Sequence, residues 1–147
     1  LTARAHMMSA AAMGATAFQK GLGAIHSLSH PVGALYDTHH GMTNAVFMPY
    51  VLAFNRPAIE ERIARAAAYL GIAGGFDGFA QAILDLRADL KVPHTLPELI
   101  KDFAPDQARK ELIADMAIVD PTAGGNPIEL TKEAALGLLD QAIEGAI

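Results

Sequence analysis

The sequence has no cysteine and no tryptophan among its 147 residues, and aromatic side chains make up only 6%. Without cysteine, the chain cannot form a disulfide or a thiolate metal site, and covalent haem attachment through C-x-x-C-H is excluded. Any metal ion would have to be held by nitrogen and oxygen atoms. The absence of cysteine also fits a reducing compartment, so we expect a cytoplasmic protein.

Long apolar runs and basic clusters are scarce as well. The uncharged stretch over residues 38–55 contains two histidines, two asparagines and a proline. It is a poor membrane span, because a spanning helix needs about 20 mostly apolar residues. The 11 lysines and arginines are scattered and the formal net charge is −5, so nucleic acid is a poor candidate partner.

Alanine, leucine, isoleucine and methionine supply most of the 52% hydrophobic content, a composition that favours helices. Apolar positions recur with a helical period and no strand pattern occurs, so we predict one all-α, multi-helix, bundle-like domain over residues 1–147. Asn55 is predicted to cap a helix that has Pro57 in its first turn. The predicted helices cover residues 2–19, 22–35, 41–55, 59–70, 76–90, 96–103, 105–119 and 132–147.

Four of the six histidines fall within residues 21–45, in the stretch GLGAIHSLSHPVGALYDTHHGMTNA. His26 and His30 are four residues apart, so they share one face of the predicted 22–35 helix. Apolar residues, among them Leu28 and Val32, fall roughly opposite and predict a buried side. Pro31 has no N–H to donate, so a kink is expected beside His30. The other two histidines are His39 and His40.

Spacing alone leaves several interpretations open. The H-E-x-x-H pattern of zinc proteases is absent, and no E-x-x-H occurs, so a ferritin-like di-iron bundle is not supported. An i,i+4 histidine pair also arises by chance, so purely structural histidines remain an alternative. Asp37 could orient a histidine, but a role in capping a turn is favoured. His6 is a candidate core or interface residue, and three methionines are predicted to fill the core: Met7, Met8 and Met13.

Residues 21–55 resemble the histidine-rich signature of the iron-containing (group III) alcohol dehydrogenases. The pattern is G-L-G-x-x-H-x-x-x-H-x-x-G, then H-G-x-x-N-A, an apolar run and F-N. A weaker similarity extends to LKVPHTLPELI (90–100) and DPTAGGNPIELT (120–131). The resemblance implies the C-terminal helical domain of the dehydroquinate synthase-like fold. In that family an N-terminal α/β nucleotide-binding domain precedes this part, and the metal lies in the cleft between the two domains.

The resemblance also implies residue roles. His26 and His40 would be two of four ligands of a divalent ion, Fe²⁺ or Zn²⁺, with an aspartate and a histidine supplied upstream of this chain. His30 would lie beside the nicotinamide of NAD or NADP and assist proton transfer, as a catalytic and cofactor-binding residue. His39 stands where many members have proline, and we interpret it as a loop variant. Thr122 is a weaker candidate for substrate contact.

We therefore expect the metal-binding helical domain of an NAD(P)-linked alcohol dehydrogenase that interconverts alcohols and aldehydes or ketones. The isolated chain is expected to be inactive without the upstream domain, and to expose an apolar or glycine-lined face near His26 and His30 where that domain docks. The whole enzyme is expected to form a homo-oligomer such as a dimer. A maleylacetate reductase or another reductase of the superfamily is one alternative, and a non-catalytic helical module with structural histidines is the other.

Overall fold

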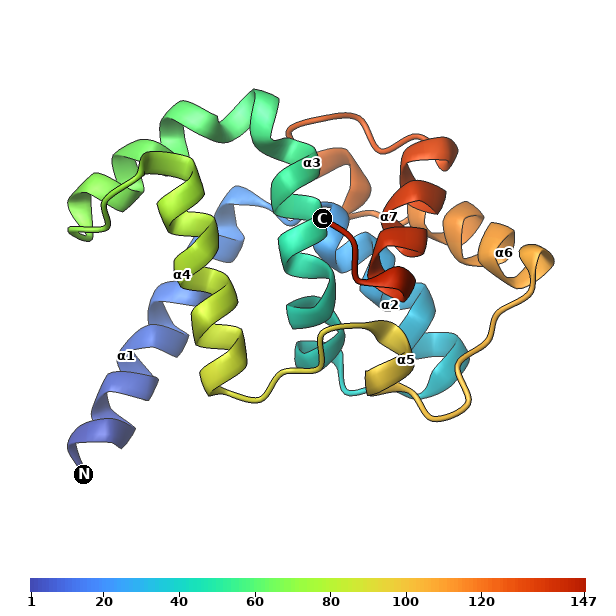
Figure 1. Cartoon of the computed structure of the whole chain (residues 1–147), viewed down its shortest axis with the longest axis horizontal. Coiled ribbons are helices and arrows are strands. Elements are labelled where there is room, and N and C mark those ends of the chain that lie inside the picture. Colours follow the sequence, from blue (N-terminus) through green and yellow to red (C-terminus); the bar gives the residue numbers. More distant parts are fainter.

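A computed structural model describes all 147 residues and consists of helices joined by short loops, without a strand (Figure 1). The all-α prediction is confirmed. None of the helices combines the length and the apolarity that crossing a bilayer requires. The elements are α1 (Thr2–Ala17), η1 (Phe18–Lys20), α2 (Ala24–Tyr36), α3 (His40–Tyr69), α4 (Gly75–Asp89), α5 (Leu96–Leu99), α6 (Gln107–Ile118), η2 (Ala123–Gly125) and α7 (Lys132–Glu144).

The core lies where α2, α3, α6 and α7 meet. Helix α2 packs against α3 and α6, α7 packs against α3 and α6, and α4 lies along α3. The core side chains are fully or nearly fully removed from water, which is the main source of folding free energy. The largest fully buried side chains are Tyr50, Phe47, Leu28, Leu96, Ile113 and Leu139. The buried side of α2 predicted from its periodicity therefore exists, and its opposite side is free to carry the histidines.

Helix α3 is longer than the sequence predicts. A break at Asn55 was expected, yet the helix runs without interruption from His40 to Tyr69 and contains both Pro49 and Pro57. The side chain of Asn55 is buried and exchanges two hydrogen bonds with Asn126, so it serves a tertiary contact and caps nothing. Proline removes an intrahelical hydrogen bond and can kink a helix without ending it, and the axis of α3 turns part-way along (Figure 1).

Helix α1 extends away from the rest of the molecule (Figure 1) and contains no buried residue. Met7, Met8 and Met13 are 68%, 74% and 73% exposed, so the prediction that they fill the core is wrong in this structure. His6, on the same helix, is exposed too. Sequence pattern identified the helix but could not supply the partner that would bury it.

Candidate metal and proton-transfer site

Helix α2 carries His26 and His30 on the side opposite its buried residues. The helix begins after Gly23, where the side-chain oxygen of Asn126 accepts a hydrogen bond from the Ala24 N–H at 3.1 Å. A Cβ atom at Gly23 would lie 2.9 Å from that oxygen, so this approach requires glycine. Because Asn126 satisfies an N–H that a helix start leaves unpaired, it holds the first turn of α2, which carries the backbone of His26.

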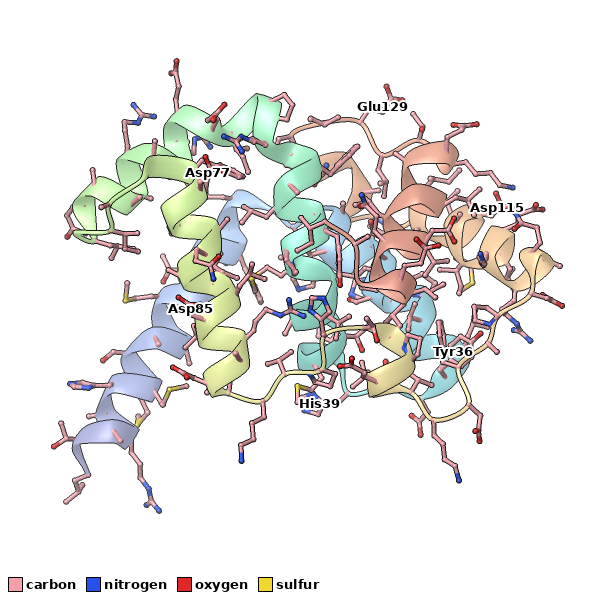
Figure 2. The ribbon with its side chains drawn as sticks, viewed as in Figure 1. Tyr36, His39, Asp77, Asp85, Asp115 and Glu129 are labelled. Atoms are coloured by element: carbon pink, nitrogen blue, oxygen red, sulfur yellow. The ribbon has the colours of Figure 1, made fainter.

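The turn between α2 and α3 brings His40 back to this surface. Asp37 ends α2 in the left-handed conformation, with φ 52° and ψ 48°, and its N–H bonds to the Gly33 carbonyl at 2.9 Å. Asp37 is exposed and forms part of the turn, which is the role that its sequence context favoured. His39 then caps α3 because its Nδ1 accepts from the Met42 N–H at 3.3 Å, and its position at the start of that helix is labelled in Figure 2. His39 is thereby engaged outside the histidine cluster.

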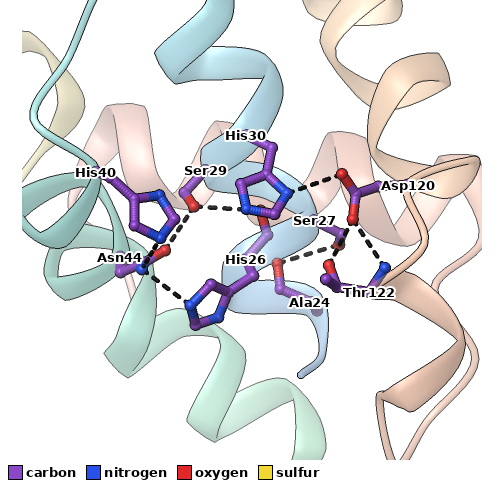
Figure 3. A network of polar contacts seen from close by, with 9 residues as sticks. All are labelled: Ala24, His26, Ser27, Ser29, His30, His40, Asn44, Asp120 and Thr122. Atoms are coloured by element: carbon purple, nitrogen blue, oxygen red, sulfur yellow. Dashed lines mark hydrogen bonds and ion pairs between the residues drawn. The ribbon is translucent and has the colours of Figure 1, made fainter. Parts of the chain in front are cut away.

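The rings of His26, His30 and His40 form one cluster (Figure 3). The centroids of His26 and His40 are 5.2 Å apart, those of His30 and His40 are 5.3 Å apart, and those of His26 and His30 are 5.9 Å apart. The His30 and His40 rings stack with an interplanar angle of 18°. Periodicity brings His26 and His30 together, but only the fold brings in His40.

The Nε2 atoms of His26 and His40 converge on one atom. The side-chain nitrogen of Asn44 lies 3.2 Å from Nε2 of His26 and 3.0 Å from Nε2 of His40. An amide nitrogen only donates, so both imidazoles accept and carry their protons on Nδ1. The Asn44 orientation agrees, since its oxygen accepts from the Ser29 hydroxyl. Unprotonated ring nitrogens are donor atoms that a divalent transition metal prefers, so this pair fits a metal site in which the ion takes the place of the Asn44 amide.

Electrostatics favours the neutral form of His26. Burial lowers its pKa below the ordinary value of 6.5, the nearby imidazoles of His40 and His30 lower it further, and Asp120 opposes the shift. Neutral imidazole is the form that binds a metal ion. No three histidine, aspartate or glutamate side chains are placed to hold one ion among themselves, so the chain offers two converging donors and not a closed site.

Asp120 was not singled out by sequence reasoning, although it opens the loop recognised over residues 120–131. Its Oδ2 lies 2.8 Å from Nδ1 of His30, and its Oδ1 accepts from both the N–H and the hydroxyl of Thr122, at 2.8 and 2.6 Å. Burial pushes the pKa of Asp120 up, but the hydrogen bonds from Thr122 and His30 outweigh it and the pKa falls below its ordinary value. Thr122 was a weaker candidate for substrate contact, but its hydroxyl donates a hydrogen bond to Asp120.

A surface hollow lies beside the cluster, with a volume of about 230 Å³. Three of its ten lining residues are glycines, so no side chain projects into the hollow at those positions. The lining residues include Gly21, Gly23, His26, Asn55, Gly125 and Asn126. This is the glycine-lined surface expected near the histidines.

Comparison with known proteins identifies the family of this chain. The family described as the Fe-containing alcohol dehydrogenase family, C-terminal, matches residues 1–143. The chain belongs to the iron-containing alcohol dehydrogenase family. Its predicted resemblance to that family is confirmed.

Three similar proteins show how far the similarity extends. A 4-hydroxybutyrate dehydrogenase of Cupriavidus necator is 39% identical over 150 residues, which cover 96% of this chain and 38% of that relative. The iron-containing alcohol dehydrogenase structure of Thermococcus thioreducens matches with a TM-score of 0.74 and 31% identity, over 84% of this chain and 32% of that one. A maleylacetate reductase structure of Rhizobium matches with a TM-score of 0.65 and 28% identity, over 86% and 33%. The chain therefore spans about a third of the length of these three proteins.

Proposed function

We propose that this chain is the metal-binding helical domain of an iron-dependent, NAD(P)-linked alcohol dehydrogenase that interconverts alcohols and aldehydes or ketones. The convergence of the His26 and His40 Nε2 atoms on one point carries the proposal. The two residues are separated by a helix end and a turn, so helical spacing cannot account for it. Membership of the family supports the reaction class.

His26 and His40 would hold Fe²⁺ or Zn²⁺, with the remaining ligands from an upstream segment. When bound, the ion supplies a Lewis acid for the alcohol oxygen, and the nicotinamide of NAD or NADP supplies the hydride acceptor. The chain would contribute the Nε2 atoms of His26 and His40, which carry no proton and can therefore bind a metal ion. Asn44 enforces that tautomer because its amide donates to both rings.

His30 lies one helical turn from His26, outside the converging pair and stacked on His40. Its side chain is 39% exposed, so a substrate hydroxyl or a cofactor ribose could approach it. With Nδ1 hydrogen-bonded to Asp120, its Nε2 is the atom that would take up or release the proton of the alcohol. In this proposal His30 is the catalytic and cofactor-contacting residue of the chain.

A second domain would complete the enzyme. Residues 1–147 would form a single helical domain that docks on an N-terminal α/β nucleotide-binding domain, and the isolated chain would lack dehydrogenase activity. The exposed apolar side chains of α1 and the glycine-lined hollow beside His26 support such a docking surface. The whole enzyme would be a cytoplasmic homo-oligomer acting on small alcohols and aldehydes.

The proposal is tested by titrating the chain with Co²⁺, Zn²⁺ and Fe²⁺, with the ring nitrogens followed by NMR and Co²⁺ by its visible absorption. Wild type is expected to bind through the Nε2 atoms of His26 and His40, and His26→Gln or His40→Gln to lose most of the signal. His39→Gln is the matched control, since His39 adjoins His40 but caps α3. Loss of binding in His39→Gln with retention in His40→Gln would show that the ligands are wrongly assigned. No metal binding by the enzyme that contains this domain together with its upstream segment would favour structural histidines.

The maleylacetate reductase similarity makes a related reductase the second candidate function. Both candidates use the same helical domain, so the metal titration does not separate them. Assaying the enzyme that contains this domain with small alcohols and with maleylacetate, with and without a chelator, does so.

A further inference from the structure

The loop after α6, residues 120–126, forms hydrogen bonds with α2 at two separate places. At its far end, the side chain of Asn126 bonds to the Ala24 N–H, to Asn55 in both directions and to the Ile128 carbonyl. At its near end, Asp120 bonds to His30 in the middle of α2. The Asn126 contacts tie the loop to α2 and α3 independently of the contact between Asp120 and His30.

In the hydrogen bond between His30 and Asp120, the donor and the acceptor can be assigned. An ionised carboxylate only accepts hydrogen bonds, so the 2.8 Å contact places a proton on Nδ1 of neutral His30 and leaves Nε2 with its lone pair. The ring lies between Asp120 on one side and His40 on the other (Figure 3), and its Nε2 lies on the side away from Asp120, toward the rings of His26 and His40. The carboxylate thus determines which nitrogen of His30 is basic.

We propose that Asp120 is a positioning residue for His30: it fixes the Nδ1–H tautomer and the orientation of the ring, and Thr122 in turn fixes Asp120. Thr122 occupies Oδ1 with two donors, so only Oδ2 is left to face the ring. This inference deepens the proposed function, because a proton-transfer group must present the correct nitrogen before substrate arrives. The positioning itself is a property of the chain and can be measured without catalysis.

A purely structural ion pair would be a poor explanation. The Asp120 side chain is 14% exposed while that of His30 is 39% exposed, and an ion pair with a partner this accessible adds little stability. Three donors nevertheless converge on the two carboxylate oxygens. Such a fully used carboxylate beside an imidazole is the arrangement that orients a histidine in acid–base catalysis.

The test is the tautomer of each histidine, read from long-range ¹H–¹⁵N correlations of the imidazole nitrogens in the 147-residue chain. Spectra are taken at a pH where the rings are neutral, on wild type, Asp120→Asn and Thr122→Val. Wild-type His30 is expected to be in the Nδ1–H form. Asp120→Asn is expected to shift His30 toward the Nε2–H form, since an amide can donate to Nδ1, and Thr122→Val to give a smaller shift in the same direction.

Asp115→Asn is the matched control. Asp115 lies on the outer side of α6 (Figure 2), pairs with Lys132 at 2.7 Å and touches no histidine, so the same substitution there is expected to leave His30 unchanged. Circular dichroism verifies that each variant is folded. If Asp120→Asn does not fold, Thr122→Val tests the claim in its place. An unchanged His30 tautomer in folded Asp120→Asn overturns the proposal, as does wild-type His30 in the Nε2–H form. No metal binding by the enzyme that contains this domain would overturn the proposed function and leave this positioning intact.

Discussion

Helices α1 and α2 follow one another in the chain and are both rich in small residues, yet they have opposite environments. Helix α2 contains six buried residues and contacts α3, α6 and the 123–125 turn. Helix α1 buries none of its residues, and its main packing partner is the short turn that follows it. A helical pattern thus predicts that a segment is a helix, while its stability depends on what is packed against it.

The largest effect that would test this comparison is local stability. Backbone amides of α2 are expected to exchange with solvent only through global unfolding, whose free energy is about 5–15 kcal/mol in such domains. Amides of α1 are expected to exchange almost as fast as in a free peptide, because a lone helix of 16 residues is marginal in water. Hydrogen exchange followed by mass spectrometry measures both. Strong protection of α1 that grows with protein concentration would instead reveal a partner surface between copies.

The next effect is on core packing. Leu28 in α2 is completely buried, whereas Met8 in α1 is 74% exposed. Leu28→Ala is expected to lower the free energy of unfolding by about 2–5 kcal/mol, because it removes buried methyl groups and leaves a cavity. Met8→Ala, a truncation of comparable size, is expected to change it by less than about 0.5 kcal/mol. Urea denaturation measures both, and similar losses would mean that α1 contributes to the core.

A smaller effect concerns the loop packed against the start of α2. A Cβ atom at Gly125 would lie 1.9 Å from the Leu22 carbonyl oxygen, whereas one at Gly124 would meet nothing within 4 Å. Gly125→Ala is expected to destabilise the fold by about 1–3 kcal/mol through overpacking, and Gly124→Ala to have little effect. Thermal unfolding of the pair is the measurement. Equal melting temperatures would show that the loop does not need this close approach.

The smallest predicted effect is a pH dependence. Burial alone would raise the pKa of Asp120, but hydrogen bonds from Thr122 and His30 hold it below its ordinary value of 3.8. A depressed pKa stabilises the folded state above the unfolded-state value, and this contribution is lost as the pH falls through the folded-state value. The stability advantage of wild type over Asp120→Asn is therefore expected to shrink as the pH falls below about 4. An advantage that grows as the pH falls further below about 4 would contradict the assigned direction.

Sequence reasoning identified the features that depend on local spacing. The i,i+4 relation of His26 and His30 and the buried side of α2 follow from helix geometry alone. Residues 21–55 also carried a family resemblance, and this associated His40 with His26 across a turn that periodicity does not describe. The helical content was predictable from the helix-favouring composition and the absence of any strand pattern.

The errors share one physical cause, which is contact between distant segments. Asn55 has the side chain of a helix cap, but Asn126, 71 residues later, provides a better partner inside the fold. The methionines of α1 have core-like side chains, but no segment of this chain packs on them. Asp120 was overlooked because its relation to His30 spans 90 residues, and no local pattern encodes it.

That separation along the chain also has a consequence for how the site forms during folding. His26 and His40 are 14 residues apart, whereas His30 and Asp120 are 90 apart. Closing the longer loop in the unfolded chain costs about 1.6 kcal/mol more in entropy than closing the shorter one. The two candidate metal ligands can therefore meet in a hairpin of α2 and the start of α3, while the oriented proton-transfer group exists only after α6 and its loop have docked. A folding intermediate with the first half of the chain in place would bind metal before it could position His30.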